Sequence, residues 1–170
     1  MGKKITVANL ICLVGAAITL LFSFFNFLEA GDVGRNAWSG DSGAWATTVP
    51  ALLAVVMLAW CIAEVVGANL PDQVLTFNSD QLKATWGIAA AGIMLSWITV
   101  DFGFNVDKGI GFWGMLLGSL AMAAGAVMAL LGKGTEVVNL GGGGGGSSES
   151  AAAPPPPPPG MTPPPPPPAP

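Results

Sequence analysis

The stretch from Ile5 to Leu28 carries no charged side chain, and this limits what the chain can form more than any other feature. A helix rises about 1.5 Å per residue, so the run would be about 36 Å long, against about 30 Å for the hydrocarbon core of a bilayer. Two lysines precede the run and two acids follow it closely: Lys3, Lys4, Glu29 and Asp32. By the positive-inside rule we expect a membrane-spanning helix over residues 5–28 with a cytoplasmic N-terminus.

A cleaved signal peptide is the main alternative for this stretch, because it also has a basic start and an apolar core. The nearest candidate cleavage site, Leu28-Glu29-Ala30, has leucine where the peptidase needs a small residue. The apolar run also exceeds the usual signal core of about 7–15 residues. These observations favour an uncleaved anchor.

Composition agrees with a membrane protein and excludes several functions. Of 170 residues, 52% are hydrophobic and 9% are charged, whereas soluble domains carry about 25% charged residues. The net charge of −4 leaves no basic field for nucleic acid. Histidine and tyrosine are absent, which removes the usual general base and the commonest metal ligand. We therefore expect no enzyme activity, no cofactor, no metal and no nucleic-acid partner.

Three further apolar runs are expected to span the membrane, at residues 49–68, 82–100 and 110–131. Pro50 fits the first turn of the second helix if Thr48 caps it, but becomes a kink if that helix begins at Ser42. Asn78-Ser79-Asp80 offers N-cap chemistry for the third helix. The predicted fold is an all-α bundle of four transmembrane helices over residues 1–133, with both chain ends in the cytoplasm.

Basic residues and tryptophans support this topology. Four lysines fall on the cytoplasmic side and two basic residues outside: Lys3, Lys4, Lys83 and Lys133 against Arg35 and Lys108. Tryptophans mark both predicted boundaries, with Trp38, Trp45, Trp97 and Trp113 at outer ends, Trp86 at an inner end and Trp60 deeper.

An internal repeat is suggested by an offset of 75 residues, which gives seven identities between residues 16–38 and 91–113. The identities include Asp32 with Asp107 and Trp38 with Trp113. We expect two parallel two-helix units whose outer loops are equivalent. Residues 98–106 alternate apolar and polar side chains, which predicts a short strand that pairs with the first loop.

The chain after Gly134 has a different composition. Six glycines and a serine-rich stretch lead to two blocks of six prolines, Pro154–Pro159 and Pro163–Pro168. Glycine and serine favour a flexible tether, and proline favours an extended polyproline II helix. Residues 134–170 are expected to be a disordered cytoplasmic tail, either a ligand for an aromatic-lined groove or a spacer.

Glu64 is the one acid well inside an apolar run, about 6 Å from its inner end at helical rise. One interpretation makes it a proton or cation site. The simpler interpretation, which the shallow depth favours, is an interfacial carboxylate that reaches water or a neighbouring polar group. Cys12 and Cys61 both lie about 10 Å from the inner ends of their runs, and they are expected to be apolar packing residues rather than a redox pair.

Two other patterns have an ordinary explanation beside a functional one. Gly114 and Gly118 stand at the spacing that lets helices approach closely, either within one subunit or in a homo-oligomer. Four outer acids are a candidate cation site, but topology and solubility explain them more simply: Asp32, Asp41, Asp101 and Asp107.

The aromatic end of the first run (FSFFNF), the outer loop GDVGRNAW, the last run GFWGMLLGSLAMAAGAVMALL and the Pro/Gly tail together resemble small four-span membrane proteins common in actinobacteria. The resemblance covers residues 1–133 by architecture and the tail by composition. It implies a location in the cell membrane more than an activity. Claudin-like proteins fit less well because the outer loop has no cysteine pair, and small multidrug exporters carry a glutamate in their first helix, which is absent here.

The favoured function is that of a membrane scaffold or accessory protein, whose bundle anchors the proline-rich tail for a protein partner in an envelope-associated complex. The alternative from a different class is a small transporter or ion-conducting subunit that uses Glu64.

Overall fold

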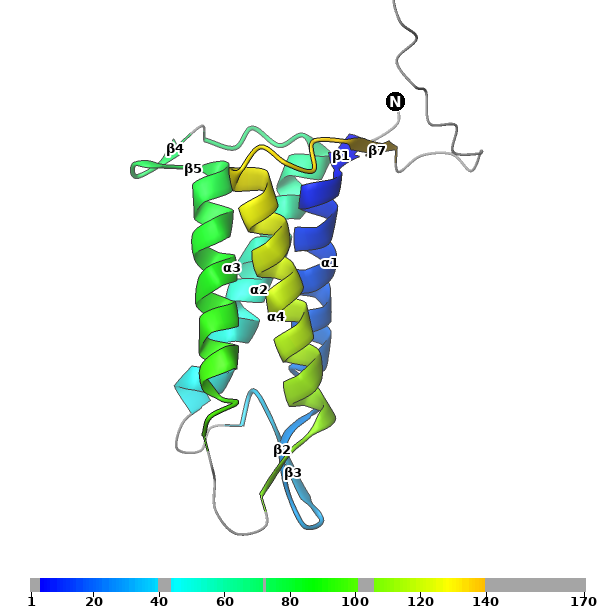
Figure 1. The fold of residues 1–170 in the computed structure, drawn as a ribbon, viewed down its shortest axis with the longest axis vertical. Helices are drawn as coiled ribbons and strands as arrows, with labels where there is room; N and C mark the ends of the chain where they lie inside the picture. The colour runs from blue at the N-terminus through cyan, green and yellow to red at the C-terminus, as the bar shows by residue number, and fades with distance from the viewer. Residues whose placement is uncertain (1–3, 40–43, 72, 101–105, 140–170) are drawn as a thin grey trace, which may run out of the picture.

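The computed structural model describes residues 4–39, 44–71, 73–100 and 106–139. Its main feature is a set of four helices that lie side by side: α1 (Val7–Phe22), α2 (Ala44–Val66), α3 (Ser79–Ser96) and α4 (Ile110–Leu130). Helices α1 and α3 each pack against both α2 and α4, so the four are arranged around a common centre (Figure 1). The prediction of a mostly helical fold is confirmed for these residues, although short strands are present as well.

Two of these helices, α2 from Ala46 and α4, are long and apolar enough to cross a membrane. Only 28% and 44% of their most apolar stretches are buried, so neither is enclosed like the core helix of a soluble protein. The other two helices do not meet the same criteria of length and hydropathy. Of these, α1 is apolar but has only 16 residues.

The first helix is shorter than the predicted 5–28 span, because the chain leaves the helix after Phe22. The hydroxyl group of Ser23 donates a hydrogen bond to the Leu20 carbonyl at 2.6 Å, and residues Asn26–Ala30 then form strand β2. Phe27 in this strand is buried between the rings of Trp97 and Phe112, each 5.4 Å away and edge-on. Aromatic side chains favour strands when they have a surface to pack on, and here that packing outweighs the continuation of an apolar helix.

One end of the bundle, which we call the sheet end, carries three short strands. Strand β2 pairs with β3 (Val33–Asn36) and with β6 (Asp107–Lys108) in the order β3-β2-β6. The expected contact between the two outer loops is therefore present, but the strand is not the predicted one. Within residues 98–106, the described positions 98–100 and 106 are not in a strand, and Leu28 and Glu29 pair instead with Lys108 and Asp107.

The opposite end, which we call the termini end, brings together both ends of the described chain (Figure 1). Strand β1 (Lys4–Thr6) pairs antiparallel with β7 (Val137–Asn139). The segment after α4 also caps α1, because the amides of Val7 and Ala8 donate to the carbonyls of Glu136 and Gly134 at 2.9 and 3.1 Å. The segment predicted as a disordered tail is thus ordered as far as Asn139, and residues 140–170 lie outside the described residues.

The starts of α2 and α3 decide two of the sequence alternatives. Helix α2 begins at Ala44, so Pro50 lies inside it, as in the earlier-start alternative. The hydroxyl groups of Thr47 and Thr48 both donate to the Ala37 carbonyl, which ties the beginning of α2 to the chain that precedes it. Helix α3, at Ser79–Ser96, begins and ends a few residues earlier than the predicted span of 82–100, and Asn78 of the predicted cap stretch is its N-cap, in a reciprocal capping box with Gln81. Just before it, β4 (Gln73–Val74) and β5 (Phe77–Asn78) form a small hairpin.

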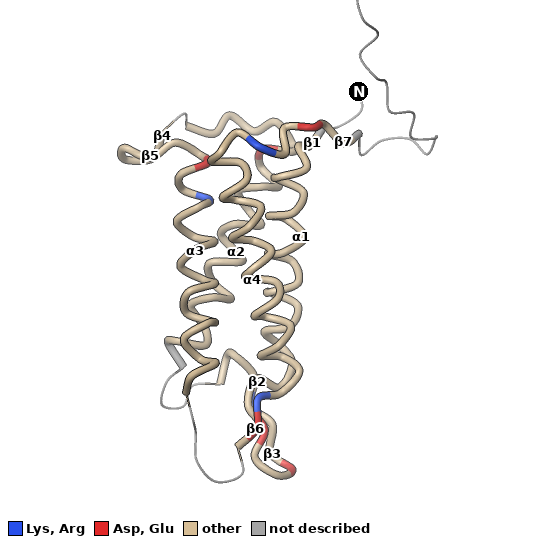
Figure 2. The backbone as a smooth tube through the Cα atoms, in the orientation of Figure 1, with Lys and Arg blue, Asp and Glu red and all other residues tan. Residues whose placement is uncertain are grey.

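The surface of the bundle is apolar along its middle, whereas its centre is built from small or flexible side chains. Exposed aliphatic residues occur on all four helices, among them Leu21, Leu52, Ile62, Ile88 and Leu117. The main buried cluster contains alanines, methionines and both cysteines, among them Ala16, Ala54, Met57, Cys12 and Cys61. Figure 2 shows that the charged residues of the described chain lie at the two ends.

Candidate functional site

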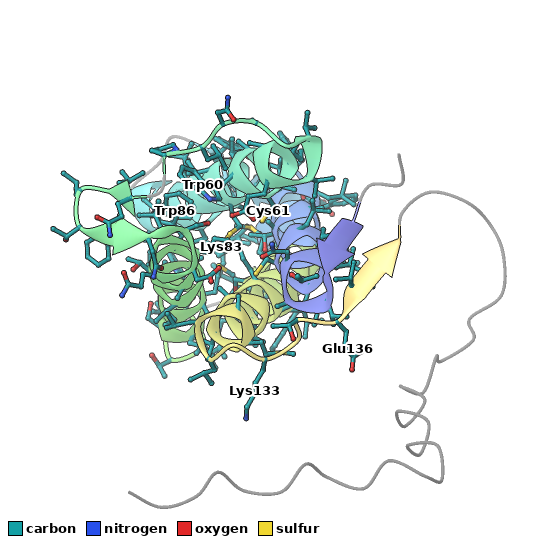
Figure 3. All side chains as sticks on the ribbon, turned by 90° about the horizontal axis from the view of Figure 1, so that it is seen from above. Trp60, Cys61, Lys83, Trp86, Lys133 and Glu136 are labelled. Atoms are coloured by element: carbon teal, nitrogen blue, oxygen red, sulfur yellow. The ribbon has the colours of Figure 1, made fainter. Side chains whose placement is uncertain are left out.

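Lys83 is the most deeply buried charged residue in the described chain, with 1% of its surface exposed. It lies in the first two turns of α3, just after the capping box, and points into the centre of the bundle, whereas Lys133 points away from it (Figure 3). A buried ammonium group must be paired and hydrogen-bonded, or its desolvation would oppose folding. The polar groups around Lys83 therefore define the site, which we call the Lys83 cluster.

Three helices supply the partners of Lys83. Its ammonium nitrogen lies 2.8 Å from Asn9 Oδ1 of α1 and 3.2 Å from Glu64 Oε2 of α2. It also lies 3.0 Å from Asp80 Oδ1 of its own helix, one turn earlier. An ammonium group has three protons, and these three residues provide an acceptor for each.

Glu64 is satisfied from both of its oxygens. Its Oε2 accepts from Asn9 Nδ2 at 3.1 Å, and its Oε1 accepts a short hydrogen bond from the Ser79 hydroxyl group. That hydroxyl group in turn accepts from Nε1 of Trp60, one turn before Glu64 on α2, at 2.9 Å. The carboxylate thus reaches neighbouring polar groups, as the simpler interpretation predicted, and Trp60 extends the same network.

Two aromatic rings flank the cluster. Trp60 and Trp86 meet edge to face with their ring centres 5.8 Å apart, and Figure 3 shows both beside Lys83. The indole of Trp60 therefore has an apolar contact on one side and a hydrogen bond to Ser79 on the other. Trp86 also packs against the buried cluster of alanine, methionine and cysteine side chains.

The cluster opens toward the termini end. A pocket of about 570 Å³ is lined by Glu64, Ser79 and Asp80 together with the chain that follows α2. The Asp80 side chain is 47% exposed and that of Glu64 is 21% exposed, whereas Lys83 is covered. The cluster holds two carboxylates and one ammonium group, which gives it a net charge of −1. Water can reach the two acids from the pocket, whereas the ammonium group is covered.

This arrangement is chemically suited to holding helices together. The lone pairs of Glu64 that face the cluster are occupied by Lys83, Asn9 and Ser79, and none of the buried side-chain polar atoms in the described residues lacks a hydrogen-bond partner. A cation or proton at Glu64 would have to compete with the Lys83 ammonium. No group of three or more potential metal ligands of the His, Cys, Asp or Glu type is found among the described residues.

The predicted glycine pair lies where α4 meets α1. A Cβ added to Gly118 would stand 2.5 Å from Thr19 Oγ1, and one added to Gly114 would overlap the ring of Phe22. The same close approach recurs at Gly125, where it would meet the Cys12 amide at 2.7 Å. This glycine face is therefore occupied within the subunit, which was one of the two alternatives.

The two cysteines are free, buried and members of the same core cluster. Cys12 donates a weak hydrogen bond to the Met122 carbonyl at 3.7 Å. Alanine and methionine side chains surround the two thiols, which agrees with the expectation that these cysteines are apolar packing residues.

The outer-loop residues of the proposed repeat are not brought together. Asp32 lies in the turn between β2 and β3, whereas Asp107 lies in β6 opposite Glu29. Trp38 precedes α2 and donates its Nε1 hydrogen to Ser23 Oγ at 2.9 Å. Trp113 lies in the first turn of α4 and is half exposed, so the described residues of these two pairs do not occupy matching places. Asp41 and Asp101 of the candidate cation site lie outside the described residues.

Sequence reasoning does not identify Lys83 and Asn9 as site residues, and it uses Lys83 only as a marker of the cytoplasmic side. The available signal is the position of Lys83 four residues after Ser79 and three after Asp80, which places it inside the helix rather than in the connection.

Comparison with protein-family models, with curated proteins and with solved structures gives no match to this chain.

Proposed function

We propose that this chain is a multi-pass integral membrane protein with four crossing helices and both termini in the cytoplasm. The observation that carries the proposal is the distribution of side chains, with many exposed leucines, isoleucines and valines on the outside of the bundle and mostly alanine, cysteine and methionine in the main buried cluster. Soluble proteins bury their large aliphatic side chains, whereas helices in lipid pack through small residues. The charged residues of the described chain lie at the two ends of the bundle and not between them, which fits helices that run across the membrane (Figure 2).

Within the membrane the bundle acts as a scaffold that anchors the proline-rich tail for a protein partner in an envelope-associated complex. Three observations support a structural bundle. The Lys83 cluster joins α1, α2 and α3, and the glycine face lets α4 pack closely against α1. The pairing of β7 with β1 holds the chain that leads into the tail. The tail itself supplies two uninterrupted proline blocks, which suit aromatic-lined grooves.

The topology is tested with a reporter fused after Pro170. A reporter that is active only in the cytoplasm is expected to give signal, and one that is active only outside the cell is expected to give none. A matched pair of fusions after Asn36 in β3, at the sheet end, should give the reverse result. Signal outside the cell from the Pro170 fusion would refute the proposed topology.

Recruitment by the tail is tested by crosslinking and purification in mild detergent. The decisive variant replaces Pro154–Pro159 and Pro163–Pro168 by glycine and serine, which keeps the length of the tail but removes the polyproline preference. We expect a partner of the original chain to be lost from this variant. An unchanged set of partners would rule out recruitment through the prolines.

A transporter that uses Glu64 is the second candidate, because this carboxylate lines a pocket that opens at the termini end. The ion pair with Lys83 weighs against it, since the charge of Glu64 is already balanced. Proton-linked flux in vesicles separates the two functions. Flux that is present in the original chain and absent in Glu64→Gln would favour the transporter, and no flux in either would remove it.

A further inference from the structure

The hairpin of β4 and β5 projects sideways from the bundle beside α3, at the termini end (Figures 1 and 3). Its six residues, Gln73–Asn78, include no charged side chain. Leu75 at its tip is 90% exposed, the highest exposure among the large hydrophobic residues of the described chain. Phe77 at the start of β5 is 44% exposed as well, so the hairpin presents two large apolar side chains to its surroundings.

The backbone conformation of the hairpin tip is unusual as well. Leu75 has a φ of 60°, and it is the one non-glycine residue with positive φ among the described residues. Two-residue hairpin turns favour glycine, asparagine or aspartate at such a position, because a bulky side chain is disfavoured there. A leucine is therefore kept in a costly conformation at a place where it contacts almost nothing in its own fold.

The hairpin is also amphipathic in a definite direction. Residues paired directly across two antiparallel strands place their side chains on the same face, so Val74 and Phe77 share one face while Gln73 and Asn78 share the other. Phe77 lines a lateral hollow of about 480 Å³ together with Ile88 of α3 and Leu130 of α4. The apolar face of the hairpin is thus continuous with the apolar sides of the bundle, and the polar face is turned the other way.

The hairpin lies at the level of the termini end, because β5 leads directly into the first turns of α3, which contain Asp80 and Lys83. Figure 2 shows that charged residues of the described chain gather at this end of the bundle. In a bilayer this is the boundary between the acyl chains and the headgroups, where uncharged apolar and aromatic side chains bind favourably while polar groups stay in water.

We propose that the β4–β5 hairpin is an interfacial foot that inserts Leu75 and Phe77 into the lipid surface beside the bundle, on the side of the termini end. This inference rests on the proposed membrane location and adds a lipid-contact site to it. The hairpin holds the start of α3 because Asn78 is both its last residue and the N-cap of that helix. The lipid contact therefore fixes the height of α3, and with it the Lys83 cluster, relative to the membrane surface.

The test uses the full chain in lipid nanodiscs with an environment-sensitive fluorophore on Leu75→Cys. Phospholipids that carry a nitroxide near the headgroup end of the acyl chain quench a fluorophore that touches lipid. Gln73→Cys, on the polar face of the hairpin, is the matched control, and Leu117→Cys on the exposed side of α4 is the positive control. The unsubstituted chain measures any labelling of the buried Cys12 and Cys61.

We expect the label at position 75 to be quenched clearly more than the label at 73, and the label at 117 to show that the nitroxide lipids reach the side of the bundle. Thr76→Cys, the other turn residue, gives a second reading if the first variant is poorly folded. Quenching at 117 without quenching at 75 and 76 would overturn the interfacial foot while leaving the membrane location intact. A blue-shifted but unquenched label at 75 would also overturn it, since a protein surface would then cover the tip. Absence of quenching at all positions would overturn both proposals.

Discussion

Removal of the Lys83 ammonium is the sharpest test of the Lys83 cluster. In Lys83→Met, the methionine fills much of the space of the lysine chain but leaves Glu64 without its counter-ion. Breaking a buried ion pair costs about 3–5 kcal/mol. We expect about 3 kcal/mol, at the low end of that range, because the Glu64 side chain keeps 21% exposure and can gain water.

A double-mutant cycle separates this electrostatic contribution from loss of packing. Glu64→Gln alone should cost about 1–2 kcal/mol, since Asp80 still pairs with Lys83 and the amide oxygen can accept its hydrogen bond. The double variant should be no less stable than Glu64→Gln alone, so the coupling energy should be at least about 3 kcal/mol, the full effect of Lys83→Met. Neutral groups of similar volume replace a buried pair at little cost.

The assay is equilibrium unfolding in mild detergent, followed by tryptophan fluorescence, which is suitable because Trp60 and Trp86 flank the cluster. Lys133→Met is the matched control, because this exposed lysine lies at the same end, and its effect should stay within about 0.5 kcal/mol. If the two single effects add within about 0.5 kcal/mol, Lys83 and Glu64 do not act as a pair and the reasoning fails.

Two further predictions concern the core. Gly118→Ala should destabilise the bundle by about 1–3 kcal/mol, because the new Cβ would stand 2.6 Å from the Thr19 amide nitrogen, whereas Gly92→Ala has no atom within 4 Å and should be neutral or slightly stabilising. Thermal unfolding followed by circular dichroism compares the two, and equal melting temperatures would contradict the close packing of α1 against α4. Cys12 and Cys61 should not react with a soluble maleimide in the folded protein and should both react after unfolding, because neither thiol is exposed. Rapid modification of the folded chain, measured by mass spectrometry, would show that the core is open.

Helix positions are predictable where a local signal marks an end. The predicted span of 110–131 agrees closely with α4 at Ile110–Leu130, because Gly109 precedes a long uninterrupted apolar run. The start of α3 is predictable from the asparagine cap. By contrast, the sequence places the end of α1 too late, at Leu28, because hydropathy does not distinguish a helix from a buried strand. The signal that it ends earlier is the contact of Phe27 with Trp97 and Phe112, which is made by distant segments of the chain.

The site is only half predictable for the same reason. Glu64 stands out in an apolar run, so its importance and its preference for a polar neighbour can be stated from the sequence. Its partners cannot, because Asn9 lies 55 residues before it and Lys83 lies 19 after it. Only the packing of α1, α2 and α3 brings these three side chains within hydrogen-bond distance.

The segment after α4 joins the two ends of the described chain. The carbonyls of Gly134 and Glu136 accept the first two amides of α1, and β7 lies along β1. A partner that pulls on the residues after Asn139 would therefore have to peel β7 from β1 and uncap α1 before the load reached α4. Tension on these residues would act first on β1 and the start of α1, so the first helix, rather than the last, would be the mechanical anchor for such a partner.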